Sequence, residues 1–273
     1  MFKTEFENLR CTCPLIHNIT NYVTVNDCAN MVLACGASPI MADDAAEVED
    51  ITTICGGLNI NIGTLNKNTI PSMFLAGKKA NELGHIVLLD PVGAGASRLR
   101  TDTANRLMQE VRFDAVRGNI SEIKTLCTGS GSTKGVDADA VDAVTEANLD
   151  DGVQLVKTFA QRAGCIVAVT GAIDLVSDGE RCWCIRNGRA EMSRITGTGC
   201  QLSALMTAFL VANPDHKLAA AAAAVCMMGL AGEIGWANMQ PGDGNSTYRN
   251  RIIDAIFNMT GDALEKGAKY ELR

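Results

Sequence analysis

The chain has 273 residues, 47% of them hydrophobic and 20% charged, and its formal net charge is −7 at pH 7. A globular chain of this length buries roughly three quarters of its unfolded surface. Because no linker-like or charge-rich run divides the sequence, we expect a single domain over residues 1–273. The acidic balance argues against nucleic acid or an anionic membrane as the main partner.

Targeting and redox features predict a cytoplasmic protein. The first ten residues carry charges of both signs and no apolar core, unlike a secretion signal. The longest apolar stretch, residues 218–232, is shorter than the roughly 20 residues that a membrane span needs, so it predicts a core helix. The 11 cysteines include no C-x-x-C pair and the 3 histidines are scattered, so the sequence does not favour a zinc site and indicates reduced thiols.

Short apolar segments alternate with helical patterns along the first two thirds of the chain. Strands are predicted at residues 14–20, 38–42, 58–63, 85–90, 114–117 and 165–170. Helices are predicted at residues 25–35, 47–55, 71–84, 101–111, 119–127 and 151–163. Residues 128–134 are rich in Gly, Ser and Thr and predict a mobile surface loop. Repeated strand-then-helix units predict a doubly wound α/β fold with a mainly parallel sheet flanked by helices.

The last third of the chain has a different pattern. A hairpin is predicted from two short strands, 175–179 and 181–186, that meet at an Asp-Gly turn. Three helices follow in the prediction, at residues 201–211, 218–236 and 247–264.

A glycine loop, Ile195-Thr-Gly-Thr-Gly-Cys200, precedes the first of these three helices. Gly197 and Gly199 allow a backbone turn with positive φ and inward-facing N–H groups. At a helix N-terminus such groups form an anion site. Cys200 would face the anion from the first turn. We therefore predict a catalytic anion hole made by Gly197, Thr198, Gly199 and Cys200; the alternative is an ordinary loop-to-helix junction.

Ligands of doubly wound sheets lie at the carboxyl ends of the strands. The predicted strand ends collect small and polar residues and one methionine, namely Asn21, Met41, Gly63, Asp90, Arg117 and Thr170. Because the glycine loop is expected at the same edge of the sheet, this set favours the anion site over the ordinary junction.

Several of these side chains suit phosphoryl transfer. Asp90 and Glu122 offer the oxygen ligands that Mg²⁺ prefers, Arg117 and Lys124 can neutralise phosphate oxygens, and Thr170 offers a hydroxyl beside a nucleotide. Such a reaction needs mainly positioning and charge stabilisation. Each residue also has a structural interpretation: Glu122 as a surface charge, Asp90 as a turn cap, Arg117 as part of an ion pair. No P-loop motif is present, and no G-x-G-x-x-G follows an early strand.

Seven segments, in this order and spacing, resemble the hydroxyethylthiazole kinase family of thiamine biosynthesis: PLIHNITNYVTVNDCAN, GASPIMA, NIGTL, DPVGAGAS, RGNISEI, VTGAIDLVSDG and ITGTGC. The resemblance covers about residues 11–265, and the combination of IHNITN with the G-T-G-C loop is its most diagnostic part. It implies a ribokinase-like fold, ATP and Mg²⁺ as cofactors, and phosphorylation of the primary alcohol of 4-methyl-5-(2-hydroxyethyl)thiazole in thiamine salvage.

The resemblance also implies roles for individual residues. Substrate contacts would come from the main-chain amide of Met41, from Gly197, and from Asn21 and Gly63 nearby. Arg117 and Thr170 would bind ATP, and Asp90 and Glu122 would organise Mg²⁺. A homotrimer is implied, with active sites at the subunit interfaces, and the aliphatic face of residues 23–31 would suit such an interface.

Cys200 stands where related sugar and vitamin kinases carry an aspartate base. We expect the helix N-terminus to lower its pKa below the ordinary thiol value of about 8.5, and we expect a modest catalytic role. Two alternatives stay open: a kinase of another small alcohol such as hydroxymethylpyrimidine, against which the missing aspartate weighs, and a non-catalytic thiazole or nucleotide binder, which would not need a cation beside an anion hole.

Overall fold

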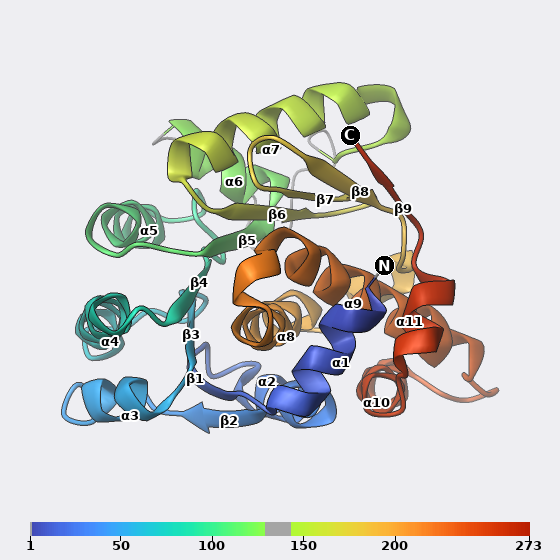
Figure 1. Ribbon diagram of the computed structural model, residues 1–273, viewed down its shortest axis with the longest axis horizontal. Helices are drawn as coiled ribbons and strands as arrows, with labels where there is room; N and C mark the ends of the chain where they lie inside the picture. The colour runs from blue at the N-terminus through green and yellow to red at the C-terminus, as the bar shows by residue number, and fades with distance from the viewer. Residues whose placement is uncertain (1, 129–142) are drawn as a thin grey trace.

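The computed structural model describes residues 2–128 and 143–273 (Figure 1). Within these ranges nine strands form one continuous sheet in the order β2-β1-β3-β4-β5-β6-β7-β8-β9. The first six in this order are parallel: β2 (Ser38–Met41), β1 (Leu15–Ile19), β3 (Gly57–Asn61), β4 (Ile86–Asp90), β5 (Ala115–Asn119) and β6 (Ile166–Thr170). Each of them was predicted, so the expected mainly parallel sheet is confirmed.

Three antiparallel strands complete the sheet: β7 (Asp174–Ser177), β8 (Cys182–Ile185) and β9 (Tyr270–Leu272). The β7–β8 pair is the predicted hairpin. β9 was not predicted, because three residues near the end of the chain are too few to show the alternation of a strand.

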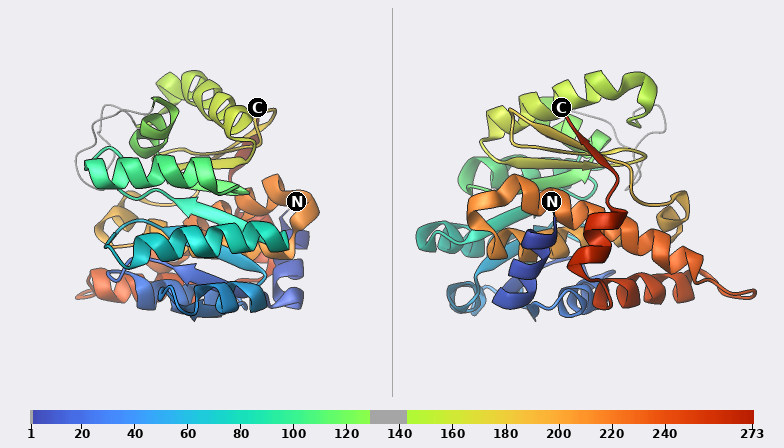
Figure 2. Two further views of the ribbon diagram at one scale, coloured as in Figure 1. Left: turned by 90° about the vertical axis from the view of Figure 1, so that its left-hand side faces the viewer. Right: turned by 45° about the vertical axis from the view of Figure 1, so that its right-hand side comes forward.

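Helices cover both faces of the sheet (Figures 1 and 2). One face carries α3 (Val48–Ile54), α4 (Thr69–Leu83), α5 (Arg98–Glu110), α6 (Ile120–Thr128) and α7 (Leu149–Ala163). The other carries α1 (Lys3–Thr12), α2 (Val25–Ala34), α8 (Thr198–Ala212), α9 (Lys217–Ala237), α10 (Asn245–Phe257) and α11 (Gly261–Gly267). A sheet covered on both faces is the doubly wound arrangement that the sequence predicted.

Two hydrophobic cores result, one on each side of the sheet, and the continuous apolar run of β4 supplies both. Ile86 and Leu88 enter the core under α8 and α9, whereas Val87 and Leu89 enter the core under α4 and α5. Fully burying a side chain of this kind contributes about 1.5–3 kcal/mol. An apolar strand with no polar alternation is therefore what a central parallel strand requires.

The long apolar helix α9 is a core helix, as predicted. It is the one helix of the described residues long and apolar enough to cross a membrane, but 83% of its most apolar window is buried inside the molecule. It packs on β6, β7 and β8 and between α8 and α10. Its apolar surface is therefore used to cover the sheet.

Some predicted boundaries were wrong. The helix expected over 247–264 is two helices, α10 and α11, because the Thr260 hydroxyl accepts a hydrogen bond from the Ala263 N–H and starts a new helix. The N-terminal helix α1 was missed, although its buried Phe6 and Leu9 have helical spacing. The predicted loop 128–134 lies outside the described residues except for Thr128, which ends α6.

Candidate active site

The carboxyl ends of the parallel strands bring the predicted site residues together. Register pairs Asn61 at the end of β3 with Asp90 at the end of β4, and Asn119 at the end of β5 with Thr170 at the end of β6. The first two turns of α8 reach the same strand ends, since Ser203 Oγ donates a hydrogen bond to Asp90 Oδ2 at 2.8 Å. The glycine loop therefore lies at the carboxyl ends of the parallel strands, where the sequence predicted that ligands bind.

Asp90 is the last residue of β4 and is fully buried. Its Oδ2 accepts hydrogen bonds from Asn61 Nδ2 and Ser203 Oγ, each at 2.8 Å, and lies 3.7 Å from Arg117 Nη1. Its Oδ1 has no hydrogen-bond partner among the described residues. Burial raises the pKa of Asp90, while Arg117 is the largest of the opposing influences. A buried carboxylate oxygen without a partner is costly, and a bound cation would satisfy it.

Glu122 is also buried, so it is not the surface charge that a glutamate near a helix start could have been. Its Oε1 accepts from the Gly93 N–H at 2.7 Å, and its Oε2 accepts from the Asn119 N–H at 2.8 Å. Asn119 Oδ1 in turn accepts from the Glu122 N–H at 2.9 Å, which fixes the start of α6. Burial, and then the nearby charge of Asp90, raises the pKa of Glu122 to about 7.

Asp90 and Glu122 are both buried, and the charge of Asp90 adds to the cost of ionising Glu122, so the pair forms a fitting site for a divalent cation. No group of three or more His, Cys, Asp or Glu side chains that could hold a metal ion occurs in the described parts of the chain. A cation here would therefore complete its coordination with water and substrate oxygens. Mg²⁺ prefers this arrangement, because it keeps several waters and binds through one or two carboxylates plus phosphates.

Arg117 joins three elements. Its Nη2 donates a hydrogen bond to Thr170 Oγ1, its Nη1 lies near Asp90, and the guanidinium covers the α8 tip at Gly199. A Cβ added to Gly199 would lie 2.4 Å from Arg117 Nη1. The side chain is only 11% exposed. The structure thus brings Arg117 and Thr170 into contact and puts a fixed positive charge beside the glycine loop.

The glycine loop itself is more helical than predicted. Gly197 has φ = +85°, and α8 begins at Thr198, three residues before the predicted start. Gly199 and Cys200 therefore belong to the first turn, whose N–H groups have no acceptor within the helix. No side chain of the described residues caps this end. Open amides, the positive end of a 15-residue helix and a neighbouring Arg117 are suited to holding an anion.

Cys200 does not have the lowered pKa that we expected. Its thiol is largely buried and accepts a hydrogen bond from Asn21 Nδ2 at 3.2 Å. Burial, followed by the charge of Asp90, raises the thiol pKa. The helix N-terminus acts in the opposite direction, but the loss of water and the neighbouring carboxylate outweigh it. Cys200 is therefore a neutral thiol at pH 7.

Of the residues predicted for substrate contact, Asn21, Gly63 and Gly197 lie together and form one wall of the site. Asn21 Nδ2 also donates to Asn61 Oδ1 at 3.0 Å, and Asn61 Oδ1 accepts from the Gly63 N–H at 2.9 Å. A Cβ on Gly197 would lie 2.2 Å from Thr24 Cγ2, so the glycine loop packs directly against this wall. Met41 ends the neighbouring edge strand β2, and its side chain is half-buried against the core under α8 and α9.

Three residues of the site were missed from the sequence: Asn61, Ser203 and Arg100. Asn61 and Ser203 both bind Asp90, and Arg100 binds the Gly63 carbonyl. The available signals were an amide near the end of the alternating segment LNINIG and a hydroxyl, Ser203, among the apolar residues that follow Gln201 in α8. Neither signal identifies a partner, because the partners come from other elements.

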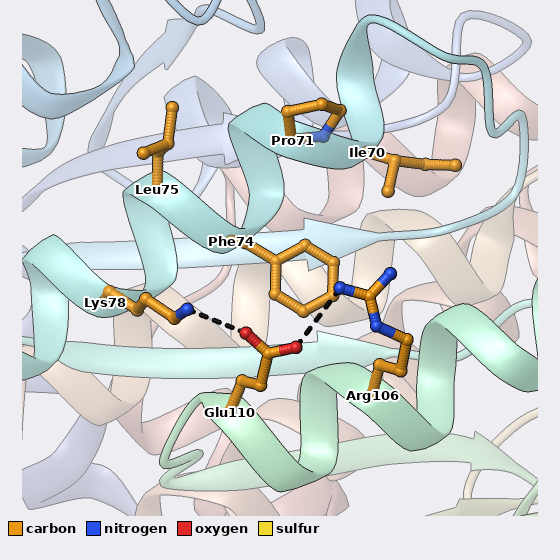
Figure 3. A pocket seen from close by; sticks show the side chains of 7 residues that line it. All are labelled: Ile70, Pro71, Phe74, Leu75, Lys78, Arg106 and Glu110. Carbon is orange, nitrogen blue, oxygen red and sulfur yellow. Dashed lines mark hydrogen bonds and ion pairs between the residues drawn. The ribbon is translucent and has the colours of Figure 1, made fainter.

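A separate surface groove of about 390 Å³ lies between α4 and α5 (Figure 3). Its apolar wall includes Phe74, whose ring is covered by Lys78 and Arg106, and both cations bind Glu110. The charges in this groove already satisfy one another, and none of the predicted site residues lines it. The groove is therefore not the candidate active site.

An uncapped helix N-terminus facing a pair of buried carboxylates and an arginine, at the strand ends of a doubly wound sheet, is typical of the small-molecule kinases of the ribokinase-like fold. Comparison with known proteins supports this fold. The solved pyridoxal kinase from Staphylococcus aureus in complex with AMP-PCP and pyridoxal shares the fold, with a TM-score of 0.60 over 95% of this chain and 98% of that one, at 12% identity.

Closer relatives identify the family. The model of the hydroxyethylthiazole kinase family matches residues 6–262. A hydroxyethylthiazole kinase from Clostridium acetobutylicum is 58% identical over 99% of both chains. The solved hydroxyethylthiazole kinase from Pyrococcus horikoshii OT3 has a TM-score of 0.88 and 33% identity, covering 100% of this chain and 98% of that one. The chain belongs to the hydroxyethylthiazole kinase family and is a kinase.

Proposed function

We propose that this enzyme transfers the γ-phosphoryl group of ATP to the primary hydroxyl of 4-methyl-5-(2-hydroxyethyl)thiazole, in the cytoplasm, to supply thiazole phosphate for thiamine salvage. The observation that carries the proposal is the uncapped N-terminus of α8, with Arg117 beside it and the buried Asp90 opposite. Open amides and a guanidinium suit the negative charge of a phosphoryl group in transit. The relatives are hydroxyethylthiazole kinases, and their name indicates the alcohol that receives the group.

In the reaction, the alcohol oxygen forms a bond to the γ-phosphorus, the bond from that phosphorus to the bridging oxygen breaks, and ADP leaves with the electron pair. The amides of Thr198, Gly199 and Cys200 would stabilise the transferring group, and Arg117 would bind phosphate oxygens together with Thr170. Mg²⁺, when bound, would be held by Asp90 and Glu122 and would neutralise phosphate charge. These contributions are electrostatic, which is the kind of catalysis that a loose phosphoryl-transfer transition state needs.

The alcohol would be oriented by the wall opposite Arg117. We assign its contacts to the main-chain amide of Met41, to Gly197, and to Asn21 and Gly63. The hydrogen bonds of Asn21 and Gly63 to Asn61 support this assignment, because they make the wall rigid before a ligand arrives. A neutral Cys200 thiol is a poor proton acceptor, so the proton of the alcohol would leave to solvent or phosphate.

The test is an assay of the purified chain with ATP, MgCl₂ and the thiazole alcohol. We expect one ADP and one thiazole phosphate for each alcohol consumed, and complete loss of turnover with excess EDTA. Turnover of hydroxymethylpyrimidine but not of the thiazole would assign the enzyme to another alcohol. Thiazole binding without ADP formation would indicate a binder.

Cys200→Ala is expected to lower turnover severalfold without abolishing it, and Cys200→Asp to match or exceed the wild type. A loose transition state demands little base strength, and the burial and Asp90 charge that raise the thiol pKa would make a carboxylate at this position a better proton acceptor. Steady-state kinetics of both variants provide the measurement, with Cys11→Ala on the exposed side of α1 as the control. Complete inactivity of the alanine variant would make Cys200 an essential base or nucleophile.

We further propose that the active unit is a homotrimer in which a second copy covers the open edge at β2. Near this edge Tyr22 is 76% exposed, Val23 58% and Leu33 56%, and Tyr22 directly follows Asn21 of the site. Met31, which we expected to contribute to the interface, is fully buried in the protomer's own core. Sedimentation equilibrium of the assayed sample measures the mass; a monomer with full activity would contradict the trimer.

A further inference from the structure

Arg100 reaches from one active-site loop to another. It lies in the first turn of α5, directly after the loop that follows β4. Its Nη2 donates a hydrogen bond of 2.6 Å to the carbonyl oxygen of Gly63, in the loop that follows β3. The guanidinium also lies against Gly93: a Cβ added there would be 2.1 Å from Arg100 Nη1 and 3.1 Å from its Cδ.

Both glycines are tied to other parts of the site. The Gly63 N–H binds Asn61 Oδ1, so Gly63 is held at its N–H by the wall proposed for substrate contact and at its carbonyl by Arg100. The Gly93 N–H binds Glu122 Oε1 at 2.7 Å. Gly93 has φ = +73°, a conformation that favours glycine and allows the guanidinium to lie on bare backbone. Arg100 therefore contacts both the Gly63 loop, which is proposed to bind the thiazole, and the Gly93 loop, whose backbone binds the Glu122 carboxylate.

The charge of Arg100 is not used in an ion pair within the described residues. By contrast, Arg98 pairs with Asp102 at 3.3 Å and Arg106 pairs with Glu110 at 3.2 Å, both on the same helix. A surface arginine on this helix thus finds an acid, whereas Arg100 donates to a backbone carbonyl of another loop. The planar guanidinium suits this contact, because one edge can donate while the rest covers Gly93.

We propose that Arg100 is a positioning residue that sets the spacing between the Gly63 loop and the Gly93 loop. The inference rests on the proposed contact of Gly63 with the thiazole. Without Arg100 the Gly63 carbonyl loses a charged donor and the Gly93 loop loses the group packed on it. The wall would then lose its fixed distance from Glu122, and the thiazole would bind less well in the catalytic geometry.

The test compares Arg100→Met with Arg98→Met, whose side chain is 94% exposed two residues away. We expect Arg100→Met to raise KM for the thiazole about tenfold, the effect of losing one charged hydrogen bond, with kcat reduced less and KM for ATP within about twofold. Calorimetric titration of thiazole into the enzyme without ATP should show the same weakening. Arg100→Lys, which keeps one donor but cannot cover Gly93, should fall between Arg100→Met and the wild type.

Three outcomes would overturn the inference. The first is that Arg100→Met shows the same thiazole affinity as Arg98→Met. The second is that Arg100→Met loses kcat with an unchanged KM for the thiazole, which would indicate that Arg100 contacts the transferring phosphate. The third is that Arg100→Lys equals the wild type, and this outcome decides the matter if Arg100→Met does not fold. Failure of the wild type to phosphorylate the thiazole would instead reject the proposed function. The two failures are therefore distinguishable.

Discussion

Gly199→Ala is expected to lower kcat by about 10²–10³-fold, the range for losing one electrostatic group of a transition-state site. The added Cβ would lie 2.4 Å from Arg117 Nη1 and 2.7 Å from its Nη2, so the guanidinium must move away from the α8 tip. Arg117 would then lose its place beside Thr170 and Asp90. The site proposed for the phosphoryl group would keep its amides but lose the guanidinium of Arg117 beside them.

The fold should tolerate this change. Gly199 lies in the helical first turn of α8, and its φ is not positive. Alanine is the better helix former there by about 1 kcal/mol, and the clashing atoms are the far end of a flexible side chain. We therefore expect a melting temperature close to that of the wild type, and a loss confined to catalysis.

The measurement is kcat at saturating ATP, Mg²⁺ and thiazole, with Gly244→Ala as the control because a Cβ there would meet nothing within 4 Å. If Gly199→Ala acts by displacing Arg117, the double variant with Arg117→Met should be no slower than Arg117→Met alone. Full additivity of the two losses would contradict this explanation, as would wild-type kcat in Gly199→Ala.

Asp90→Asn is expected to reduce kcat by about 10³-fold or more, since a carboxylate that holds a catalytic cation contributes several kcal/mol to transition-state stabilisation. The amide would keep an oxygen that accepts from Asn61 and Ser203, so the neighbouring groups stay paired. What is lost is the negative charge and the free oxygen Oδ1. A reduced apparent affinity for Mg²⁺ should accompany the loss.

The same variant should be no less stable than the wild type, and more stable at neutral pH when measured in EDTA. Burial raises the pKa of Asp90 above its ordinary value of 3.8, so the folded state binds this proton more tightly than the unfolded state. The associated stabilisation is complete below about pH 3.8 and is lost as the pH rises through the raised pKa.

Asp90→Asn has no such loss, so its unfolding free energy should exceed that of the wild type by a larger amount at pH 8 than near pH 4, close to the ordinary pKa of the group. Denaturant unfolding at the two pH values measures the difference, with the exposed Asp102→Asn as the control. A strongly destabilised Asp90→Asn at pH 8 would show that its pairing with Arg117 outweighs the cost of burying the charge.

Much of the architecture could be predicted because it depends on local patterns. The apolar run within residues 85–90 predicts a strand buried on both faces, as β4 is, and the alternation with helices predicts a parallel sheet. The glycine loop predicts an open helix N-terminus, and its place in the chain is correct apart from the helix starting at Thr198. Errors arose where the pattern is weak: the single Thr260 cap that divides the last helix, and the short strand β9.

The residues at the strand ends, the glycine loop and their order along the chain were determined by the sequence alone, and they sufficed to indicate the fold and the family. The partners of those residues were decided only by the tertiary structure. Ser203 binds Asp90 across 113 residues and Arg100 binds Gly63 across 37, distances over which sequence patterns carry no information on contact. The raised pKa of Cys200 is of the same kind: a helix start is readable in a sequence, but the burial that outweighs its dipole exists only after packing removes water from the thiol.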